Sequence, residues 1–383
     1  MNNDIEVAIA KCDNYEQENI NRAMDEVFNL IGALDDIKPN MKVIIKANLV
    51  TAMNPDRAGT THPSLLYELC KRLIEIGADV TVGDSPGGPY NKVYLNQVYK
   101  STGLTRLEEL GVHLNQNFDE VTIKYPEGKK CKEFPMTSYL QDADYIIDFC
   151  KLKSHGMMAL SCAVKNLFGI IPGTLKPEFH FRYPDYFDFA NVLIDLNEYL
   201  KPRLFIVDGI TAMEGNGPTA GVPKHVGLLL ASKNQYKLDY ICAHIIGLSM
   251  ENVPTIEESF KRGFIPKDVH EIKSNMNIDE LVVKDFDNRK THKELWFNDD
   301  KKLIARIIKK FFASKPNVNK NECIGCEKCK NVCPAKAITM VNKVPKIDRK
   351  KCIKCFCCQE FCPKGAMKVK RPFLARLMQK KKD

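Results

Sequence analysis

Cysteine is the residue type whose spacing says most about chemistry in this sequence. Nine of the 15 cysteines lie between Cys323 and Cys362, and eight of them form two runs of the pattern C-x2-C-x2-C-x3-C-P that begin 29 residues apart. The first run holds Cys323, Cys326, Cys329 and Cys333, and the second holds Cys352, Cys355, Cys358 and Cys362. Two intervening residues let a tight turn aim three thiolates at one cube, so this spacing is typical of four-iron four-sulfur (4Fe-4S) clusters. The sequence therefore predicts two such clusters.

Structural zinc is the competing interpretation, because it also uses sites of four cysteines. Zinc sites come as separated C-x2-C pairs, however, without the triple run and the terminal Cys-Pro that both copies have here. The ninth cysteine, Cys357, fits no ligand position, since its counterpart in the first copy is Lys328. We interpret Cys357 as a bystander.

The cysteine-rich end of the chain is also basic. Residues 315–383 contain 19 Lys+Arg and 5 Asp+Glu, whereas residues 1–314 carry a net charge of −5 within a chain whose total is +9. A cluster held by four thiolates carries about −2, so lysines offset this charge and can guide an acidic redox protein, as electron donor or acceptor. Nucleic acid is not favoured as the partner, because the basic region holds only three aromatic residues and no recognition motif.

Residues Asn319–Lys370 resemble bacterial two-cluster ferredoxins through these two runs. In that family the fourth cysteine of each run ligates the other cluster. The resemblance implies that cluster one binds Cys323, Cys326, Cys329 and Cys362. It implies that cluster two binds Cys352, Cys355, Cys358 and Cys333. A small α+β ferredoxin-like domain at the C-terminus and a role in electron transfer are implied as well.

The first 283 residues alternate short apolar runs with amphipathic helices, which indicates an α/β domain with a mostly parallel sheet. Six apolar runs are predicted as buried strands: Glu6–Lys11, Lys42–Lys46, Asp79–Gly83, Tyr145–Phe149, Leu204–Val207 and Val226–Ala231. The pattern predicts a helix over Pro63–Ile76, which starts with proline and stops at Gly77. A second apolar helix is predicted over Leu238–Leu248.

Four segments follow from these patterns: an α/β domain (1–283), a charged linker (284–315), the ferredoxin-like domain (316–370) and a basic tail (371–383). Asp299–Ala313 can form an amphipathic helix that docks one domain onto the other. This helix and the tail could also lie on a membrane surface, although packing against the protein is the interpretation we favour. The chain starts with polar, acidic residues and lacks a run of ~18 apolar residues, so we expect a cytoplasmic protein with reduced thiols.

Polar segments follow the predicted strands, where α/β folds place their ligands. They are Lys46–Val50, Thr61–Pro63, Gly83–Gly88, Lys151–Gly156, Ala163–Gly169 and Asp208–Gly221. Together they resemble the domain-of-unknown-function-362 (DUF362) family over about residues 5–283, because Lys-Leu-Lys-Ser-His, Ala-Val-Lys-Asn-Leu-Phe-Gly and Glu-Gly-Asn-Gly-Pro occur in the expected order. Ala47 departs from a proline that is common in the family. The resemblance implies the architecture, often joined to ferredoxin modules, and no particular reaction.

The candidate catalytic group consists of four polar residues within 14 positions of an otherwise apolar segment: Lys153, His155, Lys165 and Asn166. Burying such groups costs several kcal/mol unless they are paired, so we predict a site for a small anionic substrate, with His155 as general acid or base. Three acidic residues lie on neighbouring loops: Asp84, Asp208 and Glu214. A buried structural network is the alternative. A metal held by His62, His155 and a carboxylate is also conceivable but has no spacing signature.

Two further features have both a functional and a structural interpretation. Gly83–Gly88 could bind an anion through backbone N–H groups, although it matches neither a P-loop nor a dinucleotide fingerprint. A glycine turn without a ligand is the alternative. The six cysteines outside the runs are predicted to be small core residues: Cys12, Cys70, Cys131, Cys150, Cys162 and Cys242.

Three functions remain open on this basis. The first is an electron-transfer protein whose α/β domain docks a redox partner or uses the electrons on a bound substrate. The second is an iron–sulfur-dependent reductase (an oxidoreductase) that acts on a small anionic substrate. The third is a binding or maturation module in which the clusters are structural.

Overall fold

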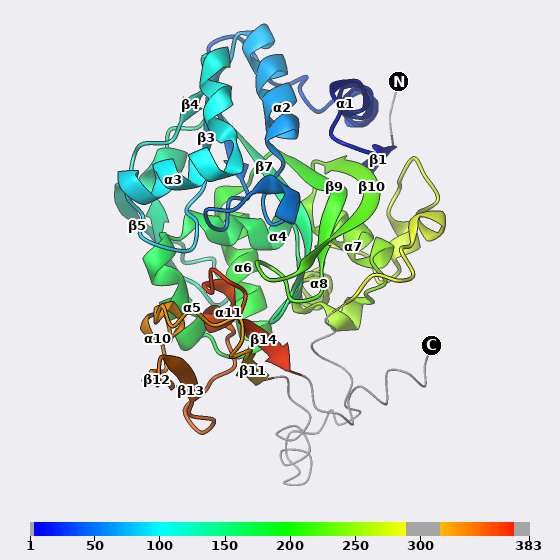
Figure 1. Ribbon diagram of the computed structural model, residues 1–383. Helices are drawn as coiled ribbons and strands as arrows, with labels where there is room; N and C mark the ends of the chain where they lie inside the picture. The colour runs from blue at the N-terminus through cyan, green and yellow to red at the C-terminus, as the bar shows by residue number, and fades with distance from the viewer. Residues whose placement is uncertain (1–3, 289–314, 371–383) are drawn as a thin grey trace.

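The computed structural model describes residues 4–288 and 315–370 (Figure 1). The predicted linker helix Asp299–Ala313 and the basic tail 371–383 lie outside the described residues. Within the described ranges, none of the helices combines the length and apolar composition that crossing a membrane requires.

The α/β domain is built on an eight-stranded sheet in the order β1-β10-β9-β7-β2-β3-β4, with β8 paired to β7. The strands are β1 (Val7–Lys11), β2 (Lys42–Ala47), β3 (Asp79–Gly83), β4 (His113–Leu114), β7 (Tyr145–His155), β8 (Ala159–Ser161), β9 (Leu204–Glu214) and β10 (Val222–Ser232). From β9 to β4 neighbouring strands run parallel, whereas β10, β1 and β8 pair antiparallel. The predicted α/β class with a mostly parallel sheet is confirmed.

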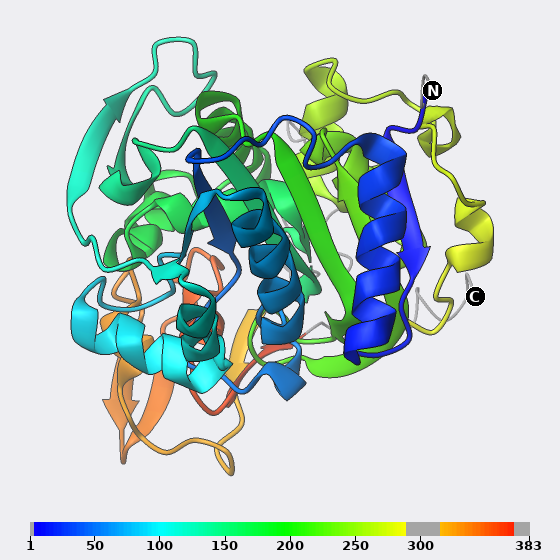
Figure 2. The ribbon, with the colours of Figure 1, turned by 90° about the horizontal axis from the view of Figure 1, so that it is seen from above.

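Helices cover both faces of this sheet (Figures 1 and 2). One face carries α1 (Gln17–Ile31), α2 (Pro63–Ile76) and α3 (Lys92–Thr102). The other carries α4 (Ala163–Asn166), α6 (Tyr186–Leu200), α7 (Gln235–Ile245) and α8 (Pro254–Lys261). In β2, the side chains of Val43 and Ile45 pack on the face that carries α1, α2 and α3, and the side chain of Ile44 packs on the other face. Burial on both faces is the reason why these strands are apolar at consecutive positions. The six cysteines predicted for the core are all buried.

Short elements complete the domain. They are the hairpin β5 (Glu120–Lys124) with β6 (Glu133–Thr137), the helix α5 (Lys176–Arg182), and the 3₁₀ helices η1 (Pro55–Arg57), η2 (Leu104–Leu110), η3 (Ser138–Leu140), η4 (Leu167–Ile170), η5 (Gly173–Leu175), η6 (Met250–Asn252), η7 (Val269–Glu271) and η8 (Ile278–Leu281).

All six predicted strands and both predicted helices are present, but four strands are longer than predicted, β2 by one residue and β7, β9 and β10 by more. Lys151–His155 and Asp208–Glu214, which we expected as loops, are the second halves of β7 and β9. The expectation was wrong because their polar side chains find partners across the sheet and therefore do not need a solvated loop. Lys151, for example, pairs with Asp208 of the adjacent strand at 2.8 Å.

Residues 315–370 form a small α+β domain. It consists of two antiparallel strand pairs, β11 (Lys315–Val318) with β14 (Met367–Lys370) and β12 (Ile338–Val341) with β13 (Val344–Ile347), and two short helices, α10 (Lys328–Asn331) and α11 (Cys357–Glu360). Each helix lies within one cysteine run. The domain, orange to red in Figure 1, lies against the α/β domain near α5.

Candidate functional site

Two small cavities in the C-terminal domain are each lined by four of the predicted ligand cysteines. The first is lined by Cys323, Cys326, Cys329 and Cys362. The second is lined by Cys333, Cys352, Cys355 and Cys358. Each cavity takes its fourth cysteine from the other run, as crossed ligation requires, and offers the four sulfur donors that a 4Fe-4S cluster uses. The residues present therefore fit such clusters.

Cys357 also lines the second cavity, although the sequence predicts no ligand role for it. Its side chain is buried next to Cys355. A hydrogen bond with Cys355, together with burial, raises the pKa of the Cys357 thiol, which keeps it protonated. Its interpretation as a bystander stays a prediction.

The loop after β9 binds the helix α11 of the C-terminal domain directly. Gln359 Nε2 donates hydrogen bonds to the carbonyl oxygens of Asn216 at 2.8 Å and Gly217 at 3.0 Å. Thr219 Oγ1 donates to the carbonyl oxygen of Glu360 at 3.1 Å. These contacts fix the second cysteine run against the α/β domain.

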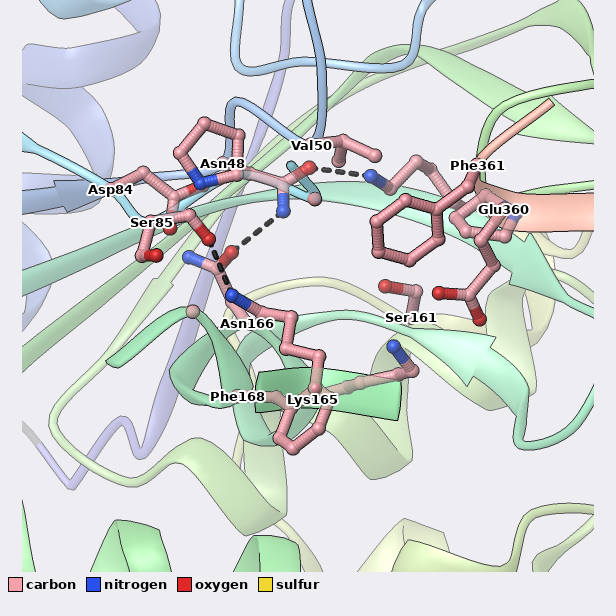
Figure 3. A pocket seen from close by; sticks show the side chains of 16 residues that line it. Asn48, Val50, Asp84, Ser85, Ser161, Lys165, Asn166, Phe168, Glu360 and Phe361 are labelled. Atoms are coloured by element: carbon pink, nitrogen blue, oxygen red, sulfur yellow. Dashed lines mark hydrogen bonds between the residues drawn. The ribbon is translucent and has the colours of Figure 1, made fainter. Parts of the chain in front are cut away.

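A pocket of about 70 Å³ lies at this junction (Figure 3). One wall comes from Glu360 and Phe361, which lie between Cys358 and Cys362 in the chain. The opposite wall comes from the ends of β2, β3, β7 and β8 and from α4. Its polar side chains are Asn48, Asp84, Ser85, Lys153, Ser161, Lys165, Asn166 and Lys176.

Two lysines of the pocket are held by oxygen atoms of the α/β domain. Lys153 Nζ donates to Asn48 Oδ1 at 2.5 Å and to the carbonyl oxygen of Gly59 at 2.9 Å. Lys176 Nζ donates to two backbone carbonyl oxygens at 2.5 and 2.6 Å. Neither ammonium group has a carboxylate partner among these bonds, so both keep positive charge available to a ligand whenever they are protonated.

A deeper network supports the floor of the pocket. Lys46 Nζ lies 2.8 Å from Asp84 Oδ1, and both side chains are buried. Asn48 Nδ2 donates to Asn166 Oδ1 at 2.7 Å, which ties the end of β2 to α4. Gly169 packs against the ion pair so closely that a Cβ atom there would lie 2.2 Å from Asp84 Oδ1. Only glycine fits at that position without displacing the pair.

Two donors in the pocket make no hydrogen bond within the described residues, although the Lys165 ammonium group lies 5.8 Å from the centre of the Phe168 ring. Lys165 Nζ makes no hydrogen bond there, and Figure 3 shows its side chain directed toward the side of the pocket that Glu360 forms. The Ser85 hydroxyl is buried and also lacks a partner in the described part of the chain. Figure 3 shows the two groups on opposite sides of the pocket, so each is a separate donor, and Lys165 is the charged one.

The electrostatics of the pocket follow from burial and crowding of charge. Burial lowers the pKa of Lys153 to about 7, and Lys165 nearby contributes to this shift. Burial likewise lowers the pKa of Lys176 to about 7, although Asp84 opposes it. Burial alone would raise the pKa of Glu360, but Lys165 and His155 hold it well below its usual range. Glu360 is therefore ionised at neutral pH, and Lys153 and Lys176 are near the point where their charge changes.

Of the four predicted catalytic residues, Lys153, Lys165 and Asn166 line the pocket and His155 does not. His155 Nδ1 accepts two backbone N–H groups at 3.0 and 3.1 Å, and its Nε2 lies 2.9 Å from Glu360 Oε1. Because Nδ1 accepts, the proton of the neutral ring is on Nε2 and faces the carboxylate. Burial lowers the pKa of His155 to about 4, so the ring is neutral at pH 7.

The acidic residues predicted near the site are separated by the fold. Asp84 lines the pocket, whereas Asp208 pairs with Lys151 on β7. Glu214, the last residue of β9, accepts a hydrogen bond from the backbone N–H group of Asp287. His62 caps α2 through its ring nitrogen, and among the described residues it does not join His155 in a convergent set of metal ligands.

Sequence reasoning missed Lys176, Glu360 and Phe361. Lys176 begins the short helix α5 and carries no local signal. Glu360 occupies the position that Asn331 has in the first cysteine run. That difference between the two copies was the signal that could have pointed to Glu360.

Raising the pH from 7 to 9.5 is expected to stabilise the protein through Lys153. Its folded-state pKa of about 7 lies below the ordinary 10.5, so between these values the unfolded chain binds a proton that the folded chain lacks. The free energy of unfolding should then rise by up to about 1.4 kcal/mol per pH unit, and this effect is absent below pH 7. Anaerobic urea unfolding of wild type and Lys153→Met at several pH values measures this effect. The free energy of unfolding should rise more steeply with pH for wild type than for Lys153→Met. Lys129→Met, at a side chain that is 48% exposed, is the control; equal slopes for wild type and Lys153→Met would contradict the prediction.

Comparison with known proteins agrees with this two-domain architecture. A family model described as a domain of unknown function (DUF362) matches residues 43–244, and one described as a 4Fe-4S dicluster domain matches residues 315–363. The thylakoid-associated protein sll1697 of Synechocystis sp. is 30% identical over 269 residues, which cover 68% of this chain and 80% of that protein.

Solved structures give more distant matches. The lactate racemase apoprotein of Thermoanaerobacterium thermosaccharolyticum has a TM-score of 0.43 and 13% identity, over 65% of this chain and 59% of that one. A protein of Thermotoga maritima has a TM-score of 0.36 and 15% identity, over 56% of this chain and 55% of that one. The chain spans less than two thirds of either structure. On the two family models and the cysteine-lined cavities, the chain is an iron–sulfur protein that belongs to the DUF362 family and carries a 4Fe-4S dicluster domain on its C-terminal side.

Proposed function

We propose that this protein is an electron-transfer protein with two 4Fe-4S clusters, and that its α/β domain binds a small anionic acceptor next to them. One observation carries the proposal. Glu360 and Phe361, from within the second cysteine run, line the same pocket as Lys153, Lys165 and Lys176. When bound, the clusters supply reversible one-electron transfer. The lysines would hold the anion, and the surrounding walls would exclude water from it.

We assign the cysteines according to the two cavities. Cluster one would bind Cys323, Cys326, Cys329 and Cys362, and cluster two would bind Cys333, Cys352, Cys355 and Cys358. Cys357 is assigned to neither. Because each run supplies one ligand to the other cluster, cluster binding would also stabilise the fold of this small domain.

A reductase is the second candidate function, and the unpartnered donors in the pocket favour it. Lys165 Nζ and Ser85 Oγ would bind the substrate, and Asn166 would position Asn48 beside it. Catalytic turnover of a small molecule by the isolated protein distinguishes this function from simple electron transfer. Reversible reduction of the clusters distinguishes both from a binding or maturation module with structural clusters.

Anaerobically reconstituted protein is expected to contain about eight iron and eight sulfide per chain, the sum for two cubane clusters. Iron and sulfide analysis checks the count, and EPR of the dithionite-reduced protein checks that the clusters accept electrons. About one zinc per four cysteines without visible absorbance would contradict the cluster assignment. Clusters that are present but cannot be reduced would contradict electron transfer.

Electron transfer from an acidic protein donor is expected to slow several-fold when ionic strength rises from about 0.05 M to about 0.5 M. The net charge of +14 in residues 315–383 stays positive after subtraction of about 4 for two clusters, and salt screens its attraction over about 8 Å at 0.15 M. Stopped-flow reduction by a flavodoxin or a ferredoxin measures the rate, with a neutral small reductant as control. A salt-independent rate with the protein donor would show that the charge does not serve this partner. The proposal implies a reducing compartment such as the cytoplasm.

A further inference from the structure

A larger groove adjoins the pocket at the junction of the two domains. Its volume is about 590 Å³, and it shares Gly87, Glu360 and Phe361 with the pocket of about 70 Å³. Small-molecule sites typically measure roughly 300–1,000 Å³, whereas the share of one water in the liquid is about 30 Å³. The pocket therefore has room for one charged group, and the groove has room for the body of a molecule.

The groove has aromatic side chains from both domains. Phe181 of α5 is 54% exposed, and Phe361 follows α11. Tyr94 also lines the groove, and its hydroxyl is held by a hydrogen bond to the carbonyl oxygen of Gly87 at 3.0 Å. A large apolar side chain exposed at the rim of a concave site is typical of ligand binding.

We infer that the ligand of this site is an aromatic carboxylate, with its carboxylate beside Lys165 and its ring in the groove lined by Phe181 and Phe361. The inference rests on the proposed function and narrows its small anion to this chemical class.

The charges of the pocket favour a singly charged head group. Asp84 and Glu360 already contribute negative charge to its walls, while Lys165 is the ammonium group without a hydrogen-bond partner among the described residues. A carboxylate needs one cation, and Lys165 Nζ supplies it.

The position of the groove explains why the ligand would bind there rather than elsewhere. Cys333 and Cys362 both line it, and we assign these two cysteines to different clusters. An aromatic ring in the groove would therefore lie next to a ligand residue of each cluster, which is the arrangement that an electron acceptor requires.

The test compares three probes on anaerobically purified, cluster-loaded full-length protein: 2-naphthoate, 2-naphthamide and acetate. Calorimetry should give one site for 2-naphthoate, with an affinity at least about ten-fold higher than for either of the other two. Lys165→Met should reduce 2-naphthoate binding to the level of the amide. Phe181→Ala should weaken both ring-containing probes by a similar factor and leave acetate unchanged. Phe260→Ala, at a phenylalanine of α8 that is 37% exposed outside the groove, is the matched control.

Each other outcome overturns the inference. Equal binding of acetate and 2-naphthoate would mean that only the small pocket is used, and equal binding of the amide would mean that the groove binds apolar molecules without a charge anchor. Absence of 2-naphthoate binding would reject the ligand class directly. EPR on the same preparation distinguishes failure of the proposed function from failure of the ligand inference. Reducible clusters without a preference for 2-naphthoate would reject only the ligand class. A preference for 2-naphthoate without reducible clusters would reject only electron transfer.

Discussion

Replacing Cys333 with alanine is expected to remove the cluster bound by Cys352, Cys355 and Cys358, and to lower the iron content from about eight to about four per chain. Cys333 belongs to the first cysteine run, but its side chain lines the cavity of the second. A 4Fe-4S cluster that loses one of four thiolate ligands is labile, so the loss should be selective. Iron analysis measures the loss of this cluster. EPR of the reduced protein also detects it, because the two clusters then no longer contribute equally to the spectrum.

The matched variant is Cys357→Ala, which removes a neighbouring thiol from the same cavity. It should leave about eight iron per chain in place. If Cys333→Ala instead spared this cluster and removed the one bound by Cys323, Cys326 and Cys329, ligation would not be crossed. If Cys357→Ala lowered the iron content as far as Cys333→Ala, Cys357 would be a ligand rather than a bystander.

Replacing His155 with alanine is expected to loosen the C-terminal domain from the α/β domain. His155 is completely buried and its Nε2 lies 2.9 Å from Glu360 Oε1, whose side chain is 16% exposed. Without the neutral ring the ionised carboxylate of Glu360 loses its nearest polar partner, and leaving a buried polar group without its partner costs about 1–3 kcal/mol. Hydrogen exchange should become faster in Gln359–Phe361 and in the facing segment Asn216–Thr219. The iron content should stay unchanged, because His155 lines neither cysteine cavity.

This experiment separates a positioning role of His155 from the catalytic role that the sequence suggested. His155→Gln keeps an N–H donor at a similar reach and should restore most of the exchange protection. Normal exchange in His155→Ala together with loss of acceptor-dependent reoxidation would instead support a general acid or base. Loss of both protection and iron would mean that the contact is needed for the C-terminal domain to fold.

A glycine at the domain contact allows the C-terminal domain to pack closely against the α/β domain. Gly156 follows β7, and a Cβ atom there would lie 2.9 Å from Gln359 Oε1 and 3.3 Å from Val369. The α/β domain therefore allows close approach at the point where α11 carries Gln359 and Glu360. Phe356 and Val369 of the C-terminal domain accordingly pack into the hydrophobic core of the α/β domain, on the face that carries α4, α6, α7 and α8.

The sequence by itself determined those features that depend on short-range spacing. The cysteine runs follow from the geometry of one turn and one cluster, and the helix Pro63–Ile76 follows from a 3.6-residue period with proline and glycine at its ends. The apolar cores of the strands were predicted for the same reason, since each is a continuous buried run. Prediction went wrong at Lys151–His155 because polar side chains in a buried strand depend on partners that are distant in the chain.

Only the tertiary structure decided where the site lies and which residues form it. Lys165 and Lys176 meet Glu360 and Phe361 in one pocket although nearly two hundred residues separate them in the chain. Local spacing carries no information about such a meeting, because it depends on how the surfaces of the two domains fit together. In the same fit His155 contacts Glu360 without lining the pocket, and Lys165 is the cation available to a ligand. Packing between the domains therefore completes a site to which the motifs of the α/β domain contribute Lys153, Lys165 and Asn166.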